Sequence, residues 1–471
     1  MLTLACYVAG KPVTSSQTLA VKNPYDGSTV GEVLVASRGD TELAINAARG
    51  FHATPTRYQR SAILDAARQK LETRREEFAR LITSESGLCL RETRYEVGRA
   101  LDVLRFASIE SLRDDGQSFA CDVSPQGKAR RIFTTREPLG CAACITPFNH
   151  PLNQVAHKIA PAIAAGTPVI LKPSEKTPLT AIRFAELLYE AGLPGPMLSL
   201  LLGPVKDIAE PLVEDPHVEL ISFTGSVNVG KRIASHAGYK KVVLELGGND
   251  PLIVLEDADL DLAVTLAAEG SYRNSGQRCT AVKRILVHEK IEVEFTRRLV
   301  EKTREYVCGN PADEATRVGT VIDEQAAIYL DTVVKEAVAA GARVLAGGDR
   351  RGALFPPTVI TNVPRDCRMV DCESFGPLAP ILTIRDLGDA IETANGTAFG
   401  LSSGIVTRSL ESALRAVREL KCGTVNVNEV PGFRVENSPF GGIKDSGLGI
   451  KEGVIEAMKC FSYVKTFSLP W

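Results

Sequence analysis

Two short segments of this 471-residue sequence carry side chains that can act together on a carbonyl group. Cys279 lies in the run Ser-Gly-Gln-Arg-Cys-Thr, and Glu245 opens the run Glu-Leu-Gly-Gly. A thiolate attacks a carbonyl carbon, and a carboxylate can later activate the water that releases the product. Taken alone, the pair also fits a buried structural cysteine and a glutamate that binds a cation.

A third segment, Ile-Thr-Pro-Phe-Asn-His-Pro, places Asn149 after a predicted apolar strand. Its side-chain amide can donate to an oxyanion, together with the backbone N–H of Cys279, and such a donor contributes roughly 3 kcal/mol. The alternative is an asparagine that only caps a turn. The three residues together therefore predict addition of a thiolate to a carbonyl, followed by hydrolysis.

A fourth segment has the form of a dinucleotide-binding turn. Phe223-Thr224-Gly225-Ser226 ends an apolar strand and begins a helix, and Gly230 lies one turn further on. Glycine lets the backbone approach a pyrophosphate, and the unpaired N–H groups of a helix N-terminus attract its charge. The spacing differs from Gly-x-Gly-x-x-Gly, so the turn by itself is a weak signal.

The elements that must position these segments alternate between strands and helices, which predicts a mostly parallel sheet with helices on both faces. Residues 41–113 are expected to be helical. We expect strands at 168–172, 197–202, 218–223 and 242–246, with helices at 178–191 and 226–237. A second alternating region, 249–431, contains strands at 284–287 and 381–384 and helices at 292–306 and 324–340. Strands at 129–135 and 461–467 are expected to pair and form a subunit contact.

The bulk composition excludes several classes of function. The net charge of -2 gives no electrostatic footprint for nucleic acid or a membrane surface. No apolar run is long enough to span a bilayer, and the N-terminus does not have the pattern of a signal peptide. Eleven scattered cysteines and six dispersed histidines indicate free thiols, a cytoplasmic location and no metal site.

These four segments, in their order along the chain, resemble those of the aldehyde dehydrogenase superfamily, and the resemblance extends from Asn23 to Gly442. The resemblance implies an α/β fold with a Rossmann-type cofactor domain (1–118 and 140–247) and an α/β catalytic domain (248–440). It also implies a small β-stranded bridging and oligomerisation arm (119–139 and 455–471). Assembly as a homodimer or homotetramer is carried over from the family. A catalytically inactive structural relative is the remote alternative.

The resemblance also assigns roles to individual residues. Cys279 is the nucleophile, Asn149 the oxyanion donor and Glu245 the base, and the presence of this base argues against the coenzyme-A-acylating branch. Lys172 or Glu245 is expected to help ionise the thiol. Glu175, with Lys172, is expected to hold the adenine ribose and to disfavour a 2′-phosphate, so NAD is preferred and NADP possible. The other residues expected to bind the cofactor are Thr224, Gly225, Ser226, Gly230, Leu246, Gly247, Glu373 and Phe375. For Lys172 and Glu175 the alternative is a pair of solvated loop charges, and for Glu373 and Phe375 it is a turn with a packed phenylalanine.

Positions that are often aromatic in relatives are polar or cationic in this chain. The expected substrate-binding residues are Arg99, His150, His157, Arg278, Thr280 and Arg434. Buried guanidinium groups need an anion, and their geometry matches carboxylate or phosphonate oxygens. The set is similar to that of phosphonoacetaldehyde dehydrogenases. The alternatives are that Arg99 lies on the surface, that Arg278 forms a salt bridge, and that His157 is packed and neutral. If two of these three hold, succinate semialdehyde, lactaldehyde or glycolaldehyde becomes the better substrate.

Overall fold

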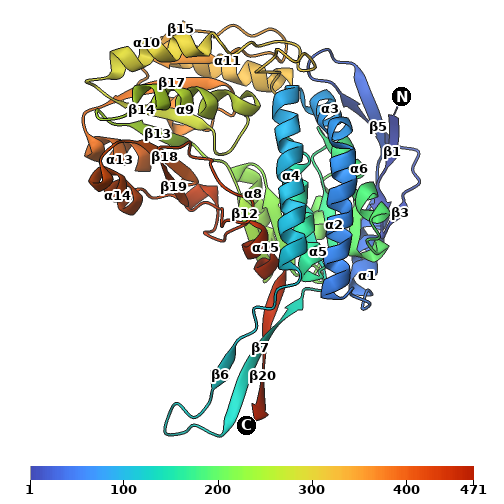
Figure 1. Cartoon of the computed structure of the whole chain (residues 1–471). Helices are drawn as coiled ribbons and strands as arrows, with labels where there is room; N and C mark the ends of the chain where they lie inside the picture. Colours follow the sequence, from blue (N-terminus) through green and yellow to red (C-terminus); the bar gives the residue numbers. More distant parts are fainter. Residues whose placement is uncertain (1) are drawn as a thin grey trace.

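The computed structural model describes residues 2–471, so Met1, with which the predicted cofactor domain begins, lies outside the described residues. Two α/β bodies lie side by side, and a narrow arm of strands projects away from them (Figure 1). The C-terminus lies at the tip of this arm.

The first body is built on a seven-stranded sheet with the order β12-β11-β8-β9-β10-β2-β3. Strands β8 to β12 are parallel, and β2 and β3 extend the sheet in antiparallel fashion. The chain runs from β8 outward to β10 and then returns to the other side of β8, which creates a topological switch point where ligands typically bind. The strand bounds are β2 (Tyr7–Val8), β3 (Lys11–Pro12), β8 (Ala142–Ile145), β9 (Val169–Lys172), β10 (Leu198–Leu200), β11 (Leu220–Thr224) and β12 (Lys241–Glu245).

Helices cover this sheet because their apolar positions recur on one face. In Figure 1, the long helices α2 and α4 stand beside each other in front of α5. The helix bounds are α1 (Arg38–Arg49), α2 (Arg57–Thr73), α3 (Arg75–Ser86), α4 (Leu90–Glu110), α5 (Asn153–Ala165), α6 (Pro178–Glu190), α7 (Ala209–Glu214) and α8 (Val227–His236). A separate sheet of β1 (Leu2–Ala5), β5 (Thr29–Leu34) and β4 (Thr18–Lys22) lies near the N-terminus.

The second body is a seven-stranded sheet with the order β15-β16-β17-β14-β13-β18-β19, in which only β15 is antiparallel to its neighbour. Its strands are β13 (Asp250–Val254), β14 (Val282–His288), β15 (Arg343–Ala346), β16 (Thr358–Thr361), β17 (Leu378–Ile384), β18 (Ser402–Val406) and β19 (Thr424–Val427). Its helices are α9 (Leu260–Tyr272), α10 (Glu292–Thr303), α11 (Glu324–Ala339), α12 (Arg368–Asp371), α13 (Leu387–Asn395) and α14 (Leu410–Glu419).

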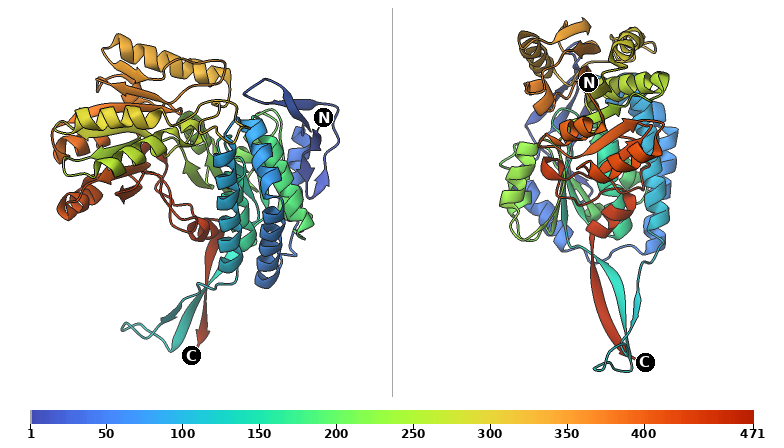
Figure 2. Two further views of the ribbon diagram at one scale, coloured as in Figure 1. Left: turned by 45° about the horizontal axis from the view of Figure 1, so that its top comes forward. Right: turned by 90° about the vertical axis from the view of Figure 1, so that its left-hand side faces the viewer.

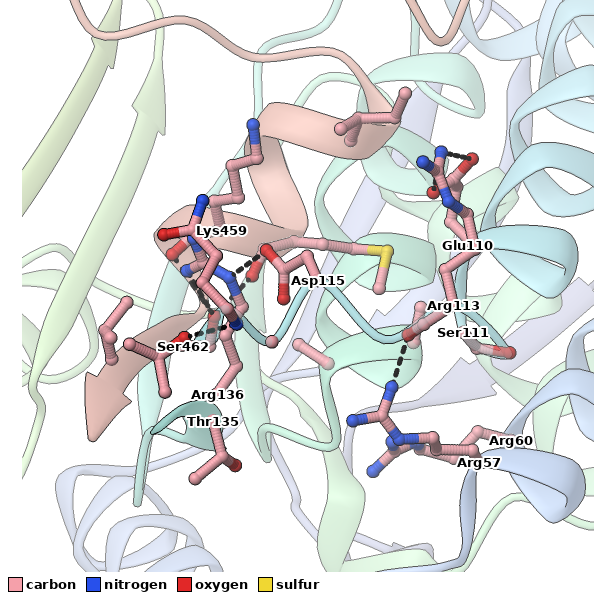
Figure 3. Close-up of a pocket in the computed structure, with 18 residues that line it drawn as sticks. Arg57, Arg60, Glu110, Ser111, Arg113, Asp115, Thr135, Arg136, Lys459 and Ser462 are labelled. Atoms are coloured by element: carbon pink, nitrogen blue, oxygen red, sulfur yellow. Dashed lines mark hydrogen bonds and ion pairs between the residues drawn. The ribbon is translucent and has the colours of Figure 1, made fainter. Parts of the chain in front are cut away.

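The arm is a three-stranded antiparallel sheet of β6 (Ser118–Ala120), β7 (Arg130–Pro138) and β20 (Ser462–Pro470). Helix α15 (Val454–Cys460) connects β20 to the first body, and both views in Figure 2 show the arm standing clear of the two bodies. A cavity of about 430 Å³ lies at its base. There Arg136 pairs with Asp115 at 2.5 Å (Figure 3). This cavity shares no lining residue with the cavity that contains Cys279.

Each strand and helix predicted from the sequence is present, with ends that differ by a few residues. The prediction missed the N-terminal sheet, and it named neither the helices α5, α7, α9, α12, α13 and α14 nor the strands β2, β3, β6, β13, β15, β16, β18 and β19. β18 begins with Ser-Ser-Gly, residues that do not favour strands, and it is fully buried between neighbours, so tertiary packing decides its conformation. The predicted division into domains remains a prediction.

In residues 2–471, helices long and apolar enough to cross a bilayer are absent. The eleven cysteines are all free thiols.

Candidate active site

The site forms where the carboxyl ends of the first sheet face the amino ends of the second. Asn149, Lys172, Thr224 and Glu245 follow or end four parallel strands of the first sheet, so they meet at one edge. The segment with Cys279 precedes β14, and the segment Glu373–Pro377 precedes its neighbour β17. The fold therefore gathers residues that are far apart in the sequence.

The loop before Cys279 has an unusual backbone. Asn274, Ser275 and Gly276 have φ values of +58°, +52° and +70°, three successive residues in the left-handed region. A Cβ atom at Gly276 would lie 2.1 Å from the carbonyl oxygen of Gly376. Only glycine allows this approach, which holds the nucleophile loop against the loop of Glu373 and Phe375.

Cys279 is partly exposed and lines a cavity of about 270 Å³. Burial of the sulfur raises the pKa of the thiol to about 12, and the charge of Lys283 opposes this shift most strongly. Lys172 and Glu245 are the residues expected to help ionise the thiol. The negative charge of Glu245 acts to raise the pKa of Cys279, so Glu245 could assist only by accepting the proton. Nζ of Lys172 lies 3.4 Å from Oε1 of Glu175, and both roles remain predictions.

Asn149 is joined to the nucleophile loop by two hydrogen bonds. Its side-chain Nδ2 donates to the backbone carbonyl of Gln277 at 2.8 Å. Its backbone carbonyl accepts from Nδ2 of Asn274 at 2.9 Å. A primary amide has two N–H donors, so one remains for another acceptor. The residue is buried, which fixes the direction of this donor.

Glu245 is buried at the end of β12, and neither carboxylate oxygen has a hydrogen-bond partner among the described residues. Burial and the nearby Glu452 raise its pKa well above the ordinary value, against the opposing charge of Lys158. Lys158 itself donates to Glu452 at 2.7 Å. A raised pKa makes a carboxylate a stronger base once its proton is lost.

The predicted cofactor residues present groups that fit a dinucleotide. The Thr224 hydroxyl is buried without a partner, and Ser226 makes no capping hydrogen bond to the N-terminus of α8. At Gly230 a Cβ atom would lie 2.4 Å from Leu246, so this glycine lets α8 pack closely beside the segment that follows β12. Gly225 belongs to the same turn, whereas Gly247 lies beside Glu373, where a Cβ atom would come within 2.4 Å of Oε2. The uncapped helix end and the free hydroxyl suit a pyrophosphate.

On the opposite side, Glu373 and Phe375 come from the loop before β17. Oε1 of Glu373 lies 3.1 Å from Nζ of Lys283 and accepts from the N–H of Gly248 at 3.2 Å. The ring of Phe375 packs edge-on against Phe148, with centroids 5.9 Å apart. The carboxylate therefore has its second oxygen available for a ligand.

Arg278 and Arg434 line the cavity that contains Cys279, together with Thr280 and His150. Burial lowers the pKa of Arg278 to about 10 and also lowers that of Arg434. Within residues 2–471, neither guanidinium forms an ion pair with a carboxylate. Nη1 of Arg434 is buried without a partner, and its guanidinium lies 4.0 Å above the ring of Phe440.

Two other residues that were expected to bind the substrate, Arg99 and His157, contact Glu436. Arg99 donates to this carboxylate through Nε at 2.5 Å and Nη2 at 3.2 Å, although it still lines the cavity. His157 also contacts Glu436, is 1% exposed and does not line the cavity. The placement of His157 on the substrate is therefore corrected: burial lowers its pKa, and the neutral ring supports Glu436.

His150 lies at the cavity with Nδ1 3.5 Å from Glu96, and burial lowers its pKa as well. Glu96 accepts from the N–H groups of Leu152 and Asn153 and thereby caps α5. His150 is therefore a neutral hydrogen-bonding group of the cavity rather than a cation.

Sequence reasoning missed Glu436, Lys283, Lys158 and Glu452. The signal for Lys158 was present, since a lysine within the apolar helix of residues 153–165 needs a buried partner. The residues around Glu436 and Lys283 form no motif, so no local sequence pattern distinguishes these two from charged residues on the surface.

Known proteins are similar to this chain in sequence and fold. The model of the aldehyde dehydrogenase family matches residues 12–467. A 3-sulfolactaldehyde dehydrogenase of Priestia aryabhattai is 41% identical over 448 residues, which cover 95% of this chain and 94% of the relative. Aldehyde dehydrogenase 21 from Physcomitrella patens, solved in complex with the reaction product succinate, has a TM-score of 0.96 and 37% identity, and the match covers 100% of this chain and 98% of that chain. A glyceraldehyde-3-phosphate dehydrogenase from Methanocaldococcus jannaschii, complexed with NADP, has a TM-score of 0.91 and 37% identity over 96% of this chain and 99% of that chain.

Proposed function

Because the chain belongs to the aldehyde dehydrogenase family, we propose that it oxidises phosphonoacetaldehyde to phosphonoacetate with NAD. The observation that carries the substrate is the pair Arg278 and Arg434, two cavity guanidinium groups without a carboxylate partner. The anion should lie only a few bonds from the carbonyl, because Arg278 directly precedes the nucleophile.

In the proposed reaction, the thiolate of Cys279 adds to the aldehyde carbon, and the carbonyl oxygen takes up the negative charge. The free N–H of Asn149 Nδ2 and the backbone N–H of Cys279 donate to this oxygen. NAD, when bound, supplies the hydride acceptor for the oxidation. A thioester then remains on the sulfur. Glu245 removes a proton from water, which attacks the thioester, releases the acid and restores the thiol.

This division of roles predicts different outcomes for two variants. Cys279→Ser should abolish turnover, because the hydroxyl is a far weaker nucleophile. Glu245→Gln should allow oxidation but stop hydrolysis, so one equivalent of NADH should form and a covalent adduct should appear by intact mass. Wild-type protein mixed with NAD alone is the control. Absence of an adduct in the Glu245 variant would mean that another group activates the water.

The charge of the cavity favours a dianion. Glu436 pairs with Arg99 and Glu92 pairs with Arg273, whereas Arg278 and Arg434 form no ion pair within the described part of the chain. Two further carboxylates, Glu269 and Glu429, also line the cavity. A phosphonate dianion can pair with both guanidinium groups, whereas a monoanion leaves one of these partly exposed groups without an ion pair. A sulfonated aldehyde is the second candidate, because the relative from Priestia is named for 3-sulfolactaldehyde. A carboxylate semialdehyde is the third, since aldehyde dehydrogenase 21 was solved with succinate.

The cofactor assignment rests on Glu175. It is exposed beside Lys172 at the end of β9, where a carboxylate accepts from a ribose 2′-OH and repels a 2′-phosphate. NADP remains the alternative cofactor, because the Methanocaldococcus protein was solved with it. A cytoplasmic location is proposed on the basis of the eleven free thiols.

Steady-state kinetics on matched aldehydes test the function. The panel comprises phosphonoacetaldehyde, sulfoacetaldehyde, succinate semialdehyde, lactaldehyde and propanal, each with saturating NAD. The phosphonate should give the highest kcat/KM, and propanal should fall below every anionic aldehyde. A higher kcat/KM for the sulfonate would transfer the assignment to that substrate, and a preference for propanal would overturn the anion site.

A further inference from the structure

Lys283 is a buried cation at the centre of the site that the proposed reaction does not use. It lies on β14, and its side chain is 2% exposed. Nζ donates to the carbonyl oxygens of Arg278 and Cys279, both at 2.7 Å, and lies 3.1 Å from Oε1 of Glu373. One ammonium group thus joins the backbone of the nucleophile to the carboxylate expected to bind the nicotinamide ribose.

Besides Lys283, the charges that act on the thiol come from three other segments. Glu373 precedes β17, Asp250 begins β13 and Glu245 ends β12, and all three act to raise the pKa of Cys279. Lys283 is the principal cation that opposes them. Burial raises the pKa of Asp250 to about 7, and the charge of Lys283 opposes that shift too. The acidity of the thiol therefore depends on how much of the Lys283 charge its anionic neighbours neutralise.

The cofactor segment after β12 lies against the same cluster. The N–H of Gly248 donates to Oε1 of Glu373, and a Cβ atom at this glycine would lie 2.4 Å from the carbonyl oxygen of Cys279. At Gly247 a Cβ atom would lie 2.4 Å from Oε2 of Glu373. A ligand that engages Glu373 therefore acts on a group in direct contact with Lys283, which in turn contacts the nucleophile.

We propose that Lys283 is a positioning residue that couples binding of the cofactor at Glu373 to ionisation of Cys279. Hydroxyl groups of the ribose donate to the carboxylate and weaken its ion pair with Lys283. More of the ammonium charge then stabilises the thiolate. The S–H bond breaks, its proton passes to water, and the electron pair stays on sulfur. The inference rests on the proposed function, which places the nicotinamide ribose at Glu373.

The test is the pH dependence of Cys279 alkylation by iodoacetamide, with and without NAD. Peptide mass mapping follows Cys279 separately from the ten other thiols. The midpoint of the pH profile reports thiolate formation even if NAD shields the sulfur and slows the reaction. In wild-type protein, NAD should shift the midpoint to lower pH. The expected shift corresponds to a thiolate fraction at neutral pH that is about tenfold larger.

Two variants should move the midpoint in opposite directions. Lys283→Met should lower the thiolate fraction of the free protein about tenfold and remove the effect of NAD, and Lys283→Arg should restore both. Glu373→Gln leaves Lys283 without its ion-pair partner. Without NAD, this variant should therefore already show the alkylation midpoint of wild-type protein with NAD. Because Glu373 is partly exposed, this variant also tests the proposal if Lys283→Met does not fold.

An unchanged midpoint in Lys283→Met, with turnover reduced, would show that Lys283 serves only the structure of the loop. An unchanged midpoint in Glu373→Gln would likewise overturn the coupling. NAD titration of wild-type protein, followed by protein fluorescence, separates these results from failure of the proposed function. If the protein does not bind NAD, the function fails and the coupling fails with it. If NAD binds and only the midpoints stay fixed, the coupling alone fails.

Discussion

At the scale of single residues, the cations that line the cavity fall into two groups: those that pair with a carboxylate and those that do not. Arg278→Ala and Arg434→Ala each remove an uncompensated guanidinium beside Cys279. Charged hydrogen bonds contribute about 1.5–3 kcal/mol, so each variant should lower kcat/KM for phosphonoacetaldehyde about 10- to 100-fold. Oxidation of propanal should be nearly unchanged.

Arg297→Ala, on the surface of α10, is the control for loss of a positive charge far from the cavity. It should leave both substrates unaffected. Equal losses on phosphonoacetaldehyde and propanal in the two cavity variants would assign Arg278 and Arg434 to the scaffold.

Glu436 offers a residue-scale prediction about stability. Burial would raise the pKa of its carboxyl, but the hydrogen bond from His157 and the charge of Arg99 hold it well below the ordinary value. Removing one partner of a buried ion pair costs about 3–5 kcal/mol, so Glu436→Ala should reduce the free energy of unfolding at pH 7 by that amount. Denaturant titration would measure it. Glu456→Ala, which breaks the exposed pair with Lys459, should cost less than about 1 kcal/mol.

The sign of the pH dependence follows from the direction of the shift. A carboxyl with a lowered folded-state pKa stabilises the protein above its unfolded-state pKa, about 4.3, and this stabilisation is lost as the pH falls. The difference between wild-type protein and Glu436→Ala should therefore shrink below about pH 4.3. A difference that stays constant down to pH 3 would contradict ionisation of Glu436 in the folded protein.

At the scale of elements, the nucleophile loop depends on its left-handed backbone. Gly276→Ala adds a Cβ atom 2.1 Å from the carbonyl oxygen of Gly376 and must displace one of the two loops. We expect a loss of about 1–3 kcal/mol in unfolding free energy and a large fall in kcat, because Cys279 and Glu373 would separate. Gly238→Ala is the matched control, since Gly238 has φ +62° but no atom within 4 Å of its Cβ position.

Gly238→Ala should cost only the backbone strain and leave kcat unchanged. A Gly276→Ala variant with normal kcat would show that contact between the two loops does not position the nucleophile. Thermal unfolding and steady-state kinetics on the same samples provide both measurements.

At the scale of the whole molecule, the arm is a sheet that stands clear of both bodies (Figure 1). Several of its apolar side chains are exposed. They include Phe119, Tyr463, Val464, Phe467, Leu469 and Trp471. Exposed apolar clusters and free strand edges mark contact surfaces, and we propose that the arm joins copies of this chain into a dimer or tetramer.

Val464→Asp should therefore shift the protein toward the monomer in sedimentation velocity, because a charge would be buried at the contact. Val293→Asp on α10 is the matched control: this valine is 79% exposed, against 52% for Val464, and lies outside the arm. A monomeric wild-type protein, or an unchanged mass for Val464→Asp, would contradict assembly through the arm.

The sequence by itself determined the family, the alternation of strands and helices, and the segments that carry Cys279, Glu245 and Asn149. These features are local, because a strand, a turn and a helix start can be predicted from a few adjacent residues. The tertiary structure decided which charges meet. Arg99 and Glu436 are 337 residues apart, and Lys283 on β14 contacts Glu373 in the loop before β17. The charge state of a buried group depends on neighbours that the chain brings together only when it folds, so Glu436 and Lys283 had no recognisable pattern in the sequence.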